Sequence, residues 1–473
     1  MILAAYAQAN DRGELHVWVG MLGVGAAPSP PRFLVDGAPS ASSSGSMQQV
    51  QATGQDWYGR FVLKPVVVKP AYSVEVLAGG QTVLFATKDL PRDVPDQMER
   101  EFQVLLFSCF SKPEDNVDLE DILVRRLNLR PDLTIMAGDQ VYLDLPVTPH
   151  LRTRDRLTDD LRDKYVANWS SAAGNTRGIM EVLQLAPVLN VPDDHEFWNN
   201  YPYVQAQLAN TWAKADRDHW TAVSKEFFEA FQRCESTTDG ASSLKVGPLR
   251  FLCVDMRSDR DDQAVNLMPP ATWNEFDRWA TDLEQTPGSV GVLCSGQSLL
   301  ARRANPALFN VGDAEMPNYS QFDRLVQRLD DLASQGIPVV YLTGDVHWGR
   351  VAAARLEGRR LLYEVISSPS TLIHVPLVDP IKKAVQGVKQ LFGGTPDPWP
   401  LHSEAEKVPD RFGPQGRFSP AALVPSVVGN QVAMVGFRRK GTGLEFSVTY
   451  YRVSPDPALN APVRCGPYPL ERY

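Results

Sequence analysis

Three short apolar segments, each followed directly by carboxylate or imidazole side chains, constrain the fold of this chain most. The segment VVYLTGD delivers Asp345 and, two residues later, His347 onto the turn after its apolar run. LTIMAGD likewise ends on Asp139, and VLNVP is followed by the run DDHE at 193–196. Apolar runs of this length predict buried strands, and the carboxyl ends of parallel strands meet at one edge of a sheet. We therefore expect a single metal site at these strand ends.

The order of apolar patterns along the chain predicts a mixed α/β protein. Residues 102–110 form a continuous apolar run, residues 117–129 have apolar side chains at helical spacing, and residues 133–139 form the next run. This order favours parallel pairing of the two strands. Helical spacing returns at about 208–234, and a hairpin pattern follows at 350–368. We therefore expect a layered, sheet-based core flanked by helices.

The first 98 residues differ from the rest of the chain. Short strand-like runs alternate there with clusters of Pro, Gly and Ser, a pattern typical of a small all-β sandwich of the immunoglobulin or fibronectin type. A polar segment at 91–100 would link this sandwich to a second domain at 99–473. Within the second domain we expect an irregular insertion at 375–430 and a C-terminal hairpin and tail at 431–473.

Composition limits the classes of function. With 47 Lys and Arg against 56 Asp and Glu, the net charge is −9, which offers no basic surface for a nucleic-acid scaffold. Five cysteines without CxxC spacing predict neither a disulfide framework nor a cysteine-rich zinc site. No export signal is visible, and no apolar run approaches the ~20 residues of a transmembrane segment. As written, the sequence predicts a cytoplasmic protein.

Two motifs near the expected site have a structural and a functional interpretation. The run at 193–196 places three carboxylates and an imidazole in four residues, which is costly unless a cation neutralises them or water surrounds them. Cys109 ends the first strand of the expected sheet. A free cysteine is usually a buried hydrophobe, but a position beside the strand ends that carry Asp139 and Asp345 favours a ligand role.

Two further motifs remain open from the residues alone. Arg257 and Arg260 flank a charged turn, and they could hold a phosphate or pair with neighbouring aspartates. Ser367, Ser368 and Ser370 follow an apolar run and could be turn residues only. The sequence has no GxSxG, GxGxxG or P-loop motif, so the common serine-hydrolase and nucleotide-binding chemistries are not indicated.

Taken together, these motifs resemble those of the PhoD-like alkaline phosphatases, a branch of the binuclear metallophosphatase superfamily. The resemblance rests on six pieces in the family's order: SCF at 108–110, GDQVY at 138–142, DDHE at 193–196, VDMRSDR at 254–260, TGDVH at 343–347 and EVISSP at 364–369. It implies that residues 99–473 form an αββα-layered metallophosphatase catalytic domain. The preceding β-sandwich also fits the layout of the family.

The resemblance also implies the ligands of a ferric ion and a calcium ion. The iron would be held by Cys109, Asp139, Tyr142 and His347. Asp139 would bridge to the calcium, whose other carboxylate ligands would be Asp194 and Asp345. DDHE stands where the wider superfamily has GNHE, and TGDVH where it has GHxH. Because oxygen replaces nitrogen at the second ion, we expect calcium there, with zinc or manganese as alternatives.

From this resemblance we expect a metal-dependent hydrolase of small phosphomonoesters or phosphodiesters. His195 would protonate the leaving alkoxide, and Arg257 would clamp the phosphate. Two alternatives share the same residues. One is a glycan- or partner-binding protein with a structural metal centre, and the other is a metal-dependent hydrolase of another bond. Family members are commonly exported, in contrast to the cytoplasmic expectation above, and the oligomeric state stays open.

Overall fold

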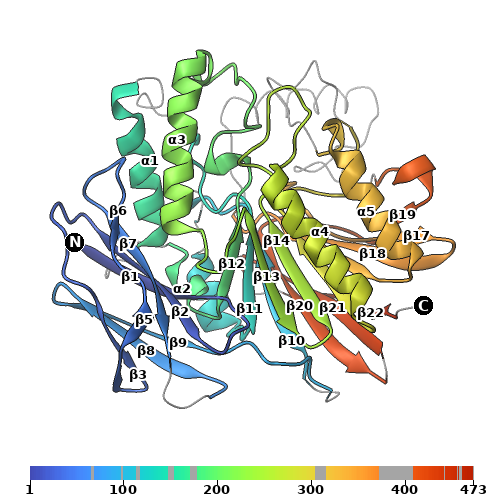
Figure 1. Cartoon of the computed structure of the whole chain (residues 1–473), viewed down its shortest axis with the longest axis horizontal. Coiled ribbons are helices and arrows are strands. Elements are labelled where there is room, and N and C mark those ends of the chain that lie inside the picture. Colours follow the sequence, from blue (N-terminus) through green and yellow to red (C-terminus); the bar gives the residue numbers. More distant parts are fainter. Residues whose placement is uncertain are drawn as a thin grey trace.

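The protein has a mixed α/β fold, as expected from the sequence. The computed structural model describes residues 1–64, 69–96, 100–112, 115, 118–146, 154–170, 178–303, 316–371, 408–441, 443–454, 456 and 461–471. Two large β-sheets lie at its centre, and helices lie on their outer sides (Figure 1). None of the helices in these ranges has the length and apolar character needed to cross a bilayer.

The larger sheet has eleven strands in the described part of the chain. At its centre β10, β11 and β12 run parallel, as the apolar runs predict. β20 pairs antiparallel with β10 on one side, and β1 pairs parallel with β12 on the other. The order across the sheet is β22 (Val463–Leu470), β21 (Gly443–Arg452), β20 (Gln431–Lys440), β10 (Phe102–Phe107), β11 (Leu133–Ala137), β12 (Val188–Val191), β1 (Ile2–Gln8), β2 (Leu15–Leu22), β7 (Trp57–Leu63) and β5 (Ser42–Ser44), with β6 (Gln48–Gln49) also on β7.

The second sheet has seven strands in the described residues and packs face to face on the first. Its central strands are parallel, and the predicted hairpin forms β17 and β18. Apolar side chains from both sheets form one buried cluster between them. The order is β13 (Ala241–Val246), β14 (Leu249–Val254), β15 (Val290–Cys294), β16 (Val339–Thr343), β18 (Arg359–Ile366), β17 (Gly349–Leu356) and β19 (Ser419–Val427).

Helices cover the outer face of each large sheet. On the eleven-stranded sheet the apolar faces of α1 (Arg154–Trp169), α2 (Met180–Leu183) and α3 (Lys214–Phe231) contribute to one buried cluster. On the seven-stranded sheet α4 (Pro270–Gln285) and α5 (Phe322–Ser334) bury theirs, and both are seen at the right of Figure 1. Short helical turns complete the set: η2 (Asp121–Arg126), η4 (Asp194–Glu196), η5 (Ala209–Thr211), η7 (Met316–Asn318) and η8 (Pro414–Gly416).

The N-terminal strands form a two-layered unit that continues the central sheet. Strands β1, β2 and β7 extend the eleven-stranded sheet, and Gln8 pairs with Val188 of β12. The second layer is a four-stranded sheet in the order β4 (Ala38–Ser40), β3 (Arg32–Val35), β8 (Tyr72–Ala78) and β9 (Gln81–Thr87). Apolar side chains of both layers share a buried cluster. The sandwich is therefore joined to the rest of the protein by strand pairing.

Three segments differ in detail from the sequence prediction. The helix expected at 117–129 is short, and a left-handed φ of +59° at Asp118 fits its late start. Strand β19 lies inside the segment for which no regular structure is predicted, because its prolines obscure an edge strand that pairs with β17. The predicted hairpin at Gly441 joins β20 to β21, but the edge of the sheet is the following strand, β22. Residues 372–407 lie outside the described residues.

Candidate metal centre

The predicted strand ends converge at one place between the two large sheets. Cys109 follows β10, Asp139 follows β11, and Asp193 and Asp194 follow β12, all in the eleven-stranded sheet. Asp345 follows β16 of the facing seven-stranded sheet. Because central strands of both sheets end here, side chains separated by more than 200 residues in the sequence become neighbours.

The backbone at these strand ends is held in left-handed conformations. Cys109, Asp139, Asp345 and His347 have φ values of +55°, +55°, +66° and +61°. Such values are unfavourable for residues other than glycine and persist only where the surrounding structure enforces them. The preceding glycine allows a close approach in each Gly-Asp turn, because a Cβ at Gly344 would collide with the side chain of Ser108. A strained, tightly packed turn of this kind is typical of a functional site.

One group at the centre contains the sulfur, phenol and imidazole ligands expected for a first ion. The Cys109 thiol lies 3.4 Å from Asp139 Oδ2, and the Tyr142 hydroxyl lies 3.2 Å from His347 Nε2. Cys109 and Tyr142 also pack against each other in a small buried cluster. These four side chains are the ones that the resemblance implies for iron, and the contacts above bring them together as two pairs.

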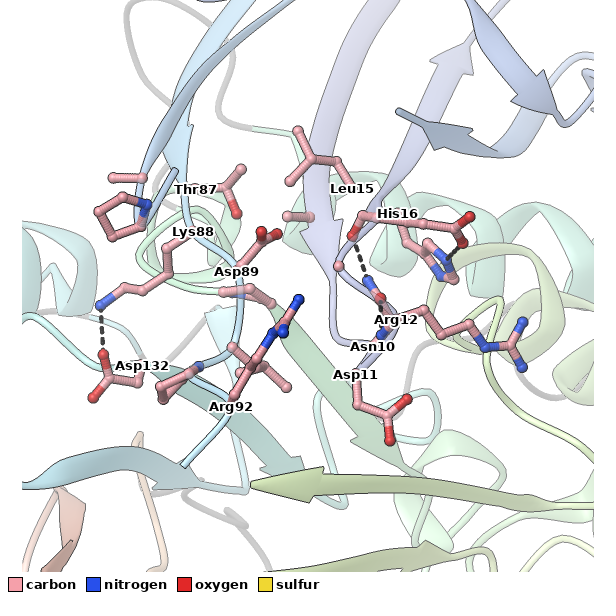
Figure 2. Close-up of a pocket in the computed structure, with 18 of the residues that line it drawn as sticks. Asn10, Asp11, Arg12, Leu15, His16, Thr87, Lys88, Asp89, Arg92 and Asp132 are labelled. Atoms are coloured by element: carbon pink, nitrogen blue, oxygen red, sulfur yellow. Dashed lines mark hydrogen bonds and ion pairs between the residues drawn. The ribbon is translucent and has the colours of Figure 1, made fainter. Parts of the chain in front are cut away.

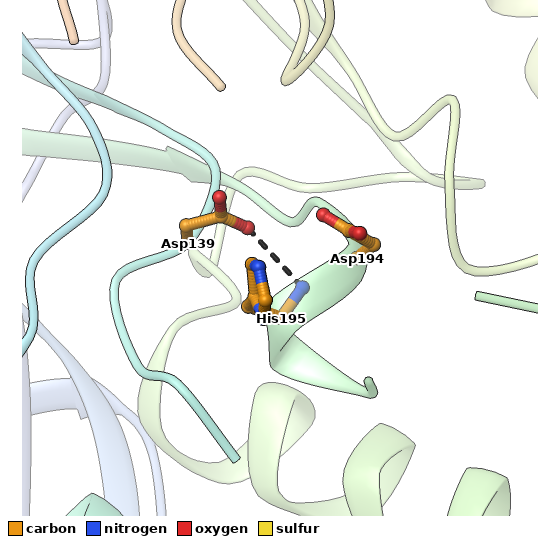
Figure 3. Close-up of side chains that lie close together, drawn as sticks. All are labelled: Asp139, Asp194 and His195. Atoms are coloured by element: carbon orange, nitrogen blue, oxygen red, sulfur yellow. Dashed lines mark hydrogen bonds between the residues drawn. The ribbon is translucent and has the colours of Figure 1, made fainter. Parts of the chain in front are cut away.

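A second group contains only carboxylates. Ligand atoms of Asp139, Asp193, Asp194 and Asp345 lie within 4.8 Å of one another, and the first three side chains are buried. Figure 3 shows Asp139 and Asp194 on either side of His195, whose backbone N–H donates to Asp139 Oδ1 at 3.2 Å. Asp139 belongs to both groups. Asp193, which was not among the predicted ligands, joins the second group.

Burial shifts the pKa values of the acidic side chains at this centre. It raises the pKa of Asp139 well above the ordinary value, and it raises that of Asp193 to about 7 against the opposing effect of Arg257. Burial also raises the pKa values of Cys109 and Tyr142, and neighbouring anionic groups add to the effect. Asp194 is the exception, because Arg257 and His195 more than offset its burial and lower its pKa. Such a cluster of acids can ionise together only beside a cation.

His195 is fixed by a carboxylate that sequence reasoning did not single out. Its Nδ1 lies 2.7 Å from Asp144 Oδ1, and the other oxygen of Asp144 accepts from the backbone N–H of Asn199 at 2.9 Å. Burial acts to lower the pKa of His195, but Asp144, Asp194 and Asp139 raise it well above the ordinary value. In the sequence, Asp144 stands two residues after the GDQVY motif, which was the available hint. That the Asp144 side chain faces His195 is seen only in the fold.

Glu196, the last residue of the DDHE run, supports the loops of the site. Its two carboxylate oxygens accept hydrogen bonds from the backbone N–H groups of Asp139, Gln140 and Asp193, at 3.0, 2.7 and 2.7 Å. The side chain is fully buried. One carboxylate therefore ties the turn after β11 to the turn after β12, which fixes the positions of two candidate ligands.

Arg257 lies at the site, but its surroundings differ from those expected for a phosphate clamp. The guanidinium is 1% exposed and lies 3.1 Å from Asp194 Oδ2 and 3.5 Å from Asp193 Oδ1. It partly compensates the charge of these two carboxylates. Arg257 could contact a phosphate directly only if its ion pairs with Asp193 and Asp194 were broken. A cation bound to these two carboxylates would break them.

The neighbouring predicted residues have structural partners. Arg260 stacks 4.8 Å above the ring of Tyr319 and donates to the carbonyl of Met256. Ser368 does more than form a turn, because its hydroxyl donates to the Cys109 sulfur at 3.1 Å and accepts from the His347 backbone N–H at 3.1 Å. Ser368 thus connects two of the candidate iron ligands. A serine in a turn carries no local signal for such a role.

Comparison of the sequence with models of protein families and with curated proteins gave no match.

Proposed function

We propose that this protein is a metal-dependent phosphoester hydrolase of the PhoD-like type, with an αββα metallophosphatase core. The observation that carries the proposal is the cluster of four carboxylates at the ends of β11, β12 and β16, where Arg257 pairs with Asp193 and Asp194 and a ring nitrogen of His195 lies beside Asp139 and Asp194. Both oxygens of Asp193 and one oxygen of Asp194 are buried without a hydrogen-bond partner in the described structure. Buried carboxylate oxygens without hydrogen-bond partners fit a site that holds cations.

The donor set favours two different ions. Cys109, Asp139, Tyr142 and His347 would hold a ferric ion, since thiolate, phenolate and imidazole suit a transition metal. Asp139, Asp194 and Asp345 would hold calcium, which prefers oxygen ligands, and Asp193 lies near enough to assist. When bound, such ions neutralise charge that builds on phosphoryl oxygens and lower the pKa of an attacking oxygen nucleophile.

The residues of the chain supply the remaining parts of a hydrolytic reaction. Asp144 holds Nδ1 of His195, so Nε2 is the ring atom that would donate a proton to the leaving oxygen of the ester. The neighbouring carboxylate of Asp144 raises the pKa of His195 and so favours the protonated imidazole. The short helical turn η4 places His195 directly after Asp194, so the acid and the metal ligand are covalent neighbours.

The proposal is tested by comparing two variants in a phosphoester panel with metal analysis. p-Nitrophenyl phosphate and bis-p-nitrophenyl phosphate should be hydrolysed, whereas p-nitrophenyl acetate should not. Asp139→Asn should lose metal and activity together, while His195→Ala should keep its metals and lose about 100-fold in kcat. Asp323→Asn, which removes an exposed carboxylate, is the control. Hydrolysis of the acetate alone would establish a hydrolase of another bond, and no turnover by metal-loaded protein would contradict an enzymatic role.

A further inference from the structure

A second site lies at the opposite end of the central sheet from the candidate metal centre. A cavity of about 880 Å³ is lined by residues of the β1–β2 turn, the segment after β9 and the starts of β11 and β12. Asp132 and Pro187, which line it, directly precede the two strands that Asp139 and Asp194 follow. A five-residue strand spans about 16 Å, so a ligand in this cavity would not contact the metal centre. The volume is within the range of about 300–1,000 Å³ that is usual for small-molecule sites.

The cavity wall contains buried polar atoms without partners. His16 and Thr87 are 3% and 4% exposed, and in the described part of the chain neither the Thr87 hydroxyl nor the two ring nitrogens of His16 have a hydrogen-bond partner. His16 Nε2 lies 3.5 Å from Glu14 Oε2 and forms an ion pair with it when the imidazole is protonated, so Nδ1 is the ring nitrogen with neither kind of contact among the described residues. Buried polar groups are normally satisfied, and such exceptions need an explanation. Their position in the wall of a large cavity is explained if a ligand supplies the missing partners.

Asp89 adds a half-satisfied carboxylate to the same cavity. Its Oδ2 accepts a hydrogen bond from the Tyr72 hydroxyl at 3.1 Å, whereas its Oδ1 is buried and has no hydrogen-bond partner among the described residues. The neighbouring Lys88 cannot serve Asp89, because its ammonium group is paired with Asp132 at 3.0 Å. Asp89 therefore offers an acceptor to a hydroxyl or ammonium group of a ligand.

Arg92 supplies the complementary charge at the mouth of the cavity. Its backbone is fixed by a hydrogen bond from Gly247, while its exposed guanidinium has no ion pair within the described ranges. Figure 2 shows Arg92 extending towards Asp89 in this view, with Thr87 on the same wall and His16 across from it. A guanidinium binds one carboxylate through two parallel hydrogen bonds. The nearby charge of Asp89 disfavours a dianion, so a carboxylate suits this cavity better than a phosphate.

We propose that this cavity binds a small organic acid that carries a hydroxyl or ammonium group a few atoms from its carboxylate. Arg92 holds the carboxylate, Asp89 accepts from the donor group, and Thr87 and His16 bond to the polar atoms that enter deepest. Leu15 and Leu90 provide apolar contact for the carbon skeleton. The site is independent of the proposed hydrolase, because it shares no residue with the metal centre.

Binding is measured by isothermal titration calorimetry with two acids and the matched alcohols that lack the carboxylate. The probes are D-gluconate with sorbitol, and L-leucine with leucinol. At least one acid should bind to the full-length protein at concentrations up to about 10 mM, and its alcohol should bind at least about tenfold more weakly. Arg92→Gln should weaken the acid about tenfold or more, and Asp89→Asn should weaken it to a similar extent.

Two controls place the binding in this cavity. Arg32→Gln removes the same charge from an exposed position on β3 outside the cavity and should leave the affinity unchanged. Asp139→Asn should also leave it unchanged, which separates this site from the metal centre whether or not the proposed hydrolase activity is found. The proposal is overturned if neither acid binds, or if the acids bind equally well to Arg92→Gln and Asp89→Asn.

Discussion

The imidazole of His195 is held by Asp144, with 2.7 Å between Nδ1 and the carboxylate oxygen, and its ring packs at a tilt of 40° against that of Tyr142, with 4.2 Å between the ring centroids. The pair is buried, since Asp144 is 1% and His195 is 7% exposed. A carboxylate in this position fixes both the orientation and the protonated nitrogen of an imidazole. Asp144 is therefore a positioning residue for the proposed general acid.

Asp144→Asn should impair turnover without removing metal. The amide keeps the size of the side chain but loses the charge that orients His195, so we expect kcat to fall by about 10- to 100-fold while KM stays nearly constant. Steady-state kinetics combined with metal analysis checks this. Asp163→Asn, on an exposed side chain of α1, is the matched control. If Asp144→Asn loses metal as Asp139→Asn does, Asp144 serves the metal centre and not His195.

Tyr142→Phe should remove a visible absorption band from iron-loaded protein. Phenolate donates electron density to a ferric ion. The Tyr142 hydroxyl lies 3.2 Å from Nε2 of His347, another candidate iron ligand. The purified protein should therefore be coloured, and the variant should lose the band while it retains calcium. Absorption spectra of wild type and variant, at matched iron content, decide the matter. A band of unchanged position and intensity in Tyr142→Phe would show that the phenol is not a ligand.

Chelation of calcium should stop turnover without bleaching the iron colour. The four carboxylates of the second group, which include Asp194 and Asp345, offer oxygen donors, and calcium accepts such a site while zinc prefers nitrogen and sulfur. Activity and absorbance are followed while a calcium-selective chelator is added, and added calcium should restore turnover. Asp345→His should shift the preference towards zinc or manganese. Full activity in the chelator would rule out calcium as the second ion.

Glu364→Gln should destabilise the fold strongly. Glu364 is fully buried and paired with Arg350, and it accepts hydrogen bonds from the backbone N–H groups of Leu299 and Leu300. Loss of its charge leaves Arg350 uncompensated, which costs about 3–5 kcal/mol in the free energy of unfolding. Urea denaturation measures the change.

The matched control for Glu364 is an exposed ion pair. Lys214 and Asp218 lie 2.8 Å apart on the surface of α3, and Asp218→Asn should change the free energy of unfolding by less than about 1 kcal/mol. The double variant Arg350→Met with Glu364→Leu should be less destabilised than the sum of the single changes, because neither charge is then left alone. If Glu364→Gln and Asp218→Asn changed the free energy of unfolding equally, the stabilising role of the buried ion pair would be contradicted.

Glu284 should contribute to stability at neutral pH and lose that contribution in acid. Hydrogen bonds from Arg328 lower the pKa of Glu284 below its ordinary value of 4.5. A lowered pKa in the folded state stabilises the protein above the ordinary pKa, and this stability is lost as pH falls through the lower value. Glu284→Gln should reduce the difference in unfolding free energy between about pH 7 and about pH 3 by about 0.2–1 kcal/mol. Arg328→Met should reproduce the effect, and an unchanged pH dependence in both variants would refute it.

The sequence alone determined the features that depend on local pattern. Apolar runs predicted the parallel strands β10 and β11, and alternation around Gly441 predicted the hairpin of β20 and β21. The candidate ligands could be found because a strand that ends in Gly-Asp needs only a few consecutive residues to be recognised. The common direction of parallel strands accounts for Asp139 and Asp194 lying at one edge of the eleven-stranded sheet, whereas Asp345 comes from the facing seven-stranded sheet.

Only the tertiary structure decided which distant groups face each other. Three features each join segments far apart in the chain: the pairing of β1 with β12, the ion pairs of Arg257 with Asp193 and Asp194, and the cavity beside Asp89. No local period encodes such pairs, because they arise when two sheets bury their apolar faces against each other and bring their strand ends together. The same is true of Asp144, whose contact with His195 depends on how the turns after β11 and β12 pack.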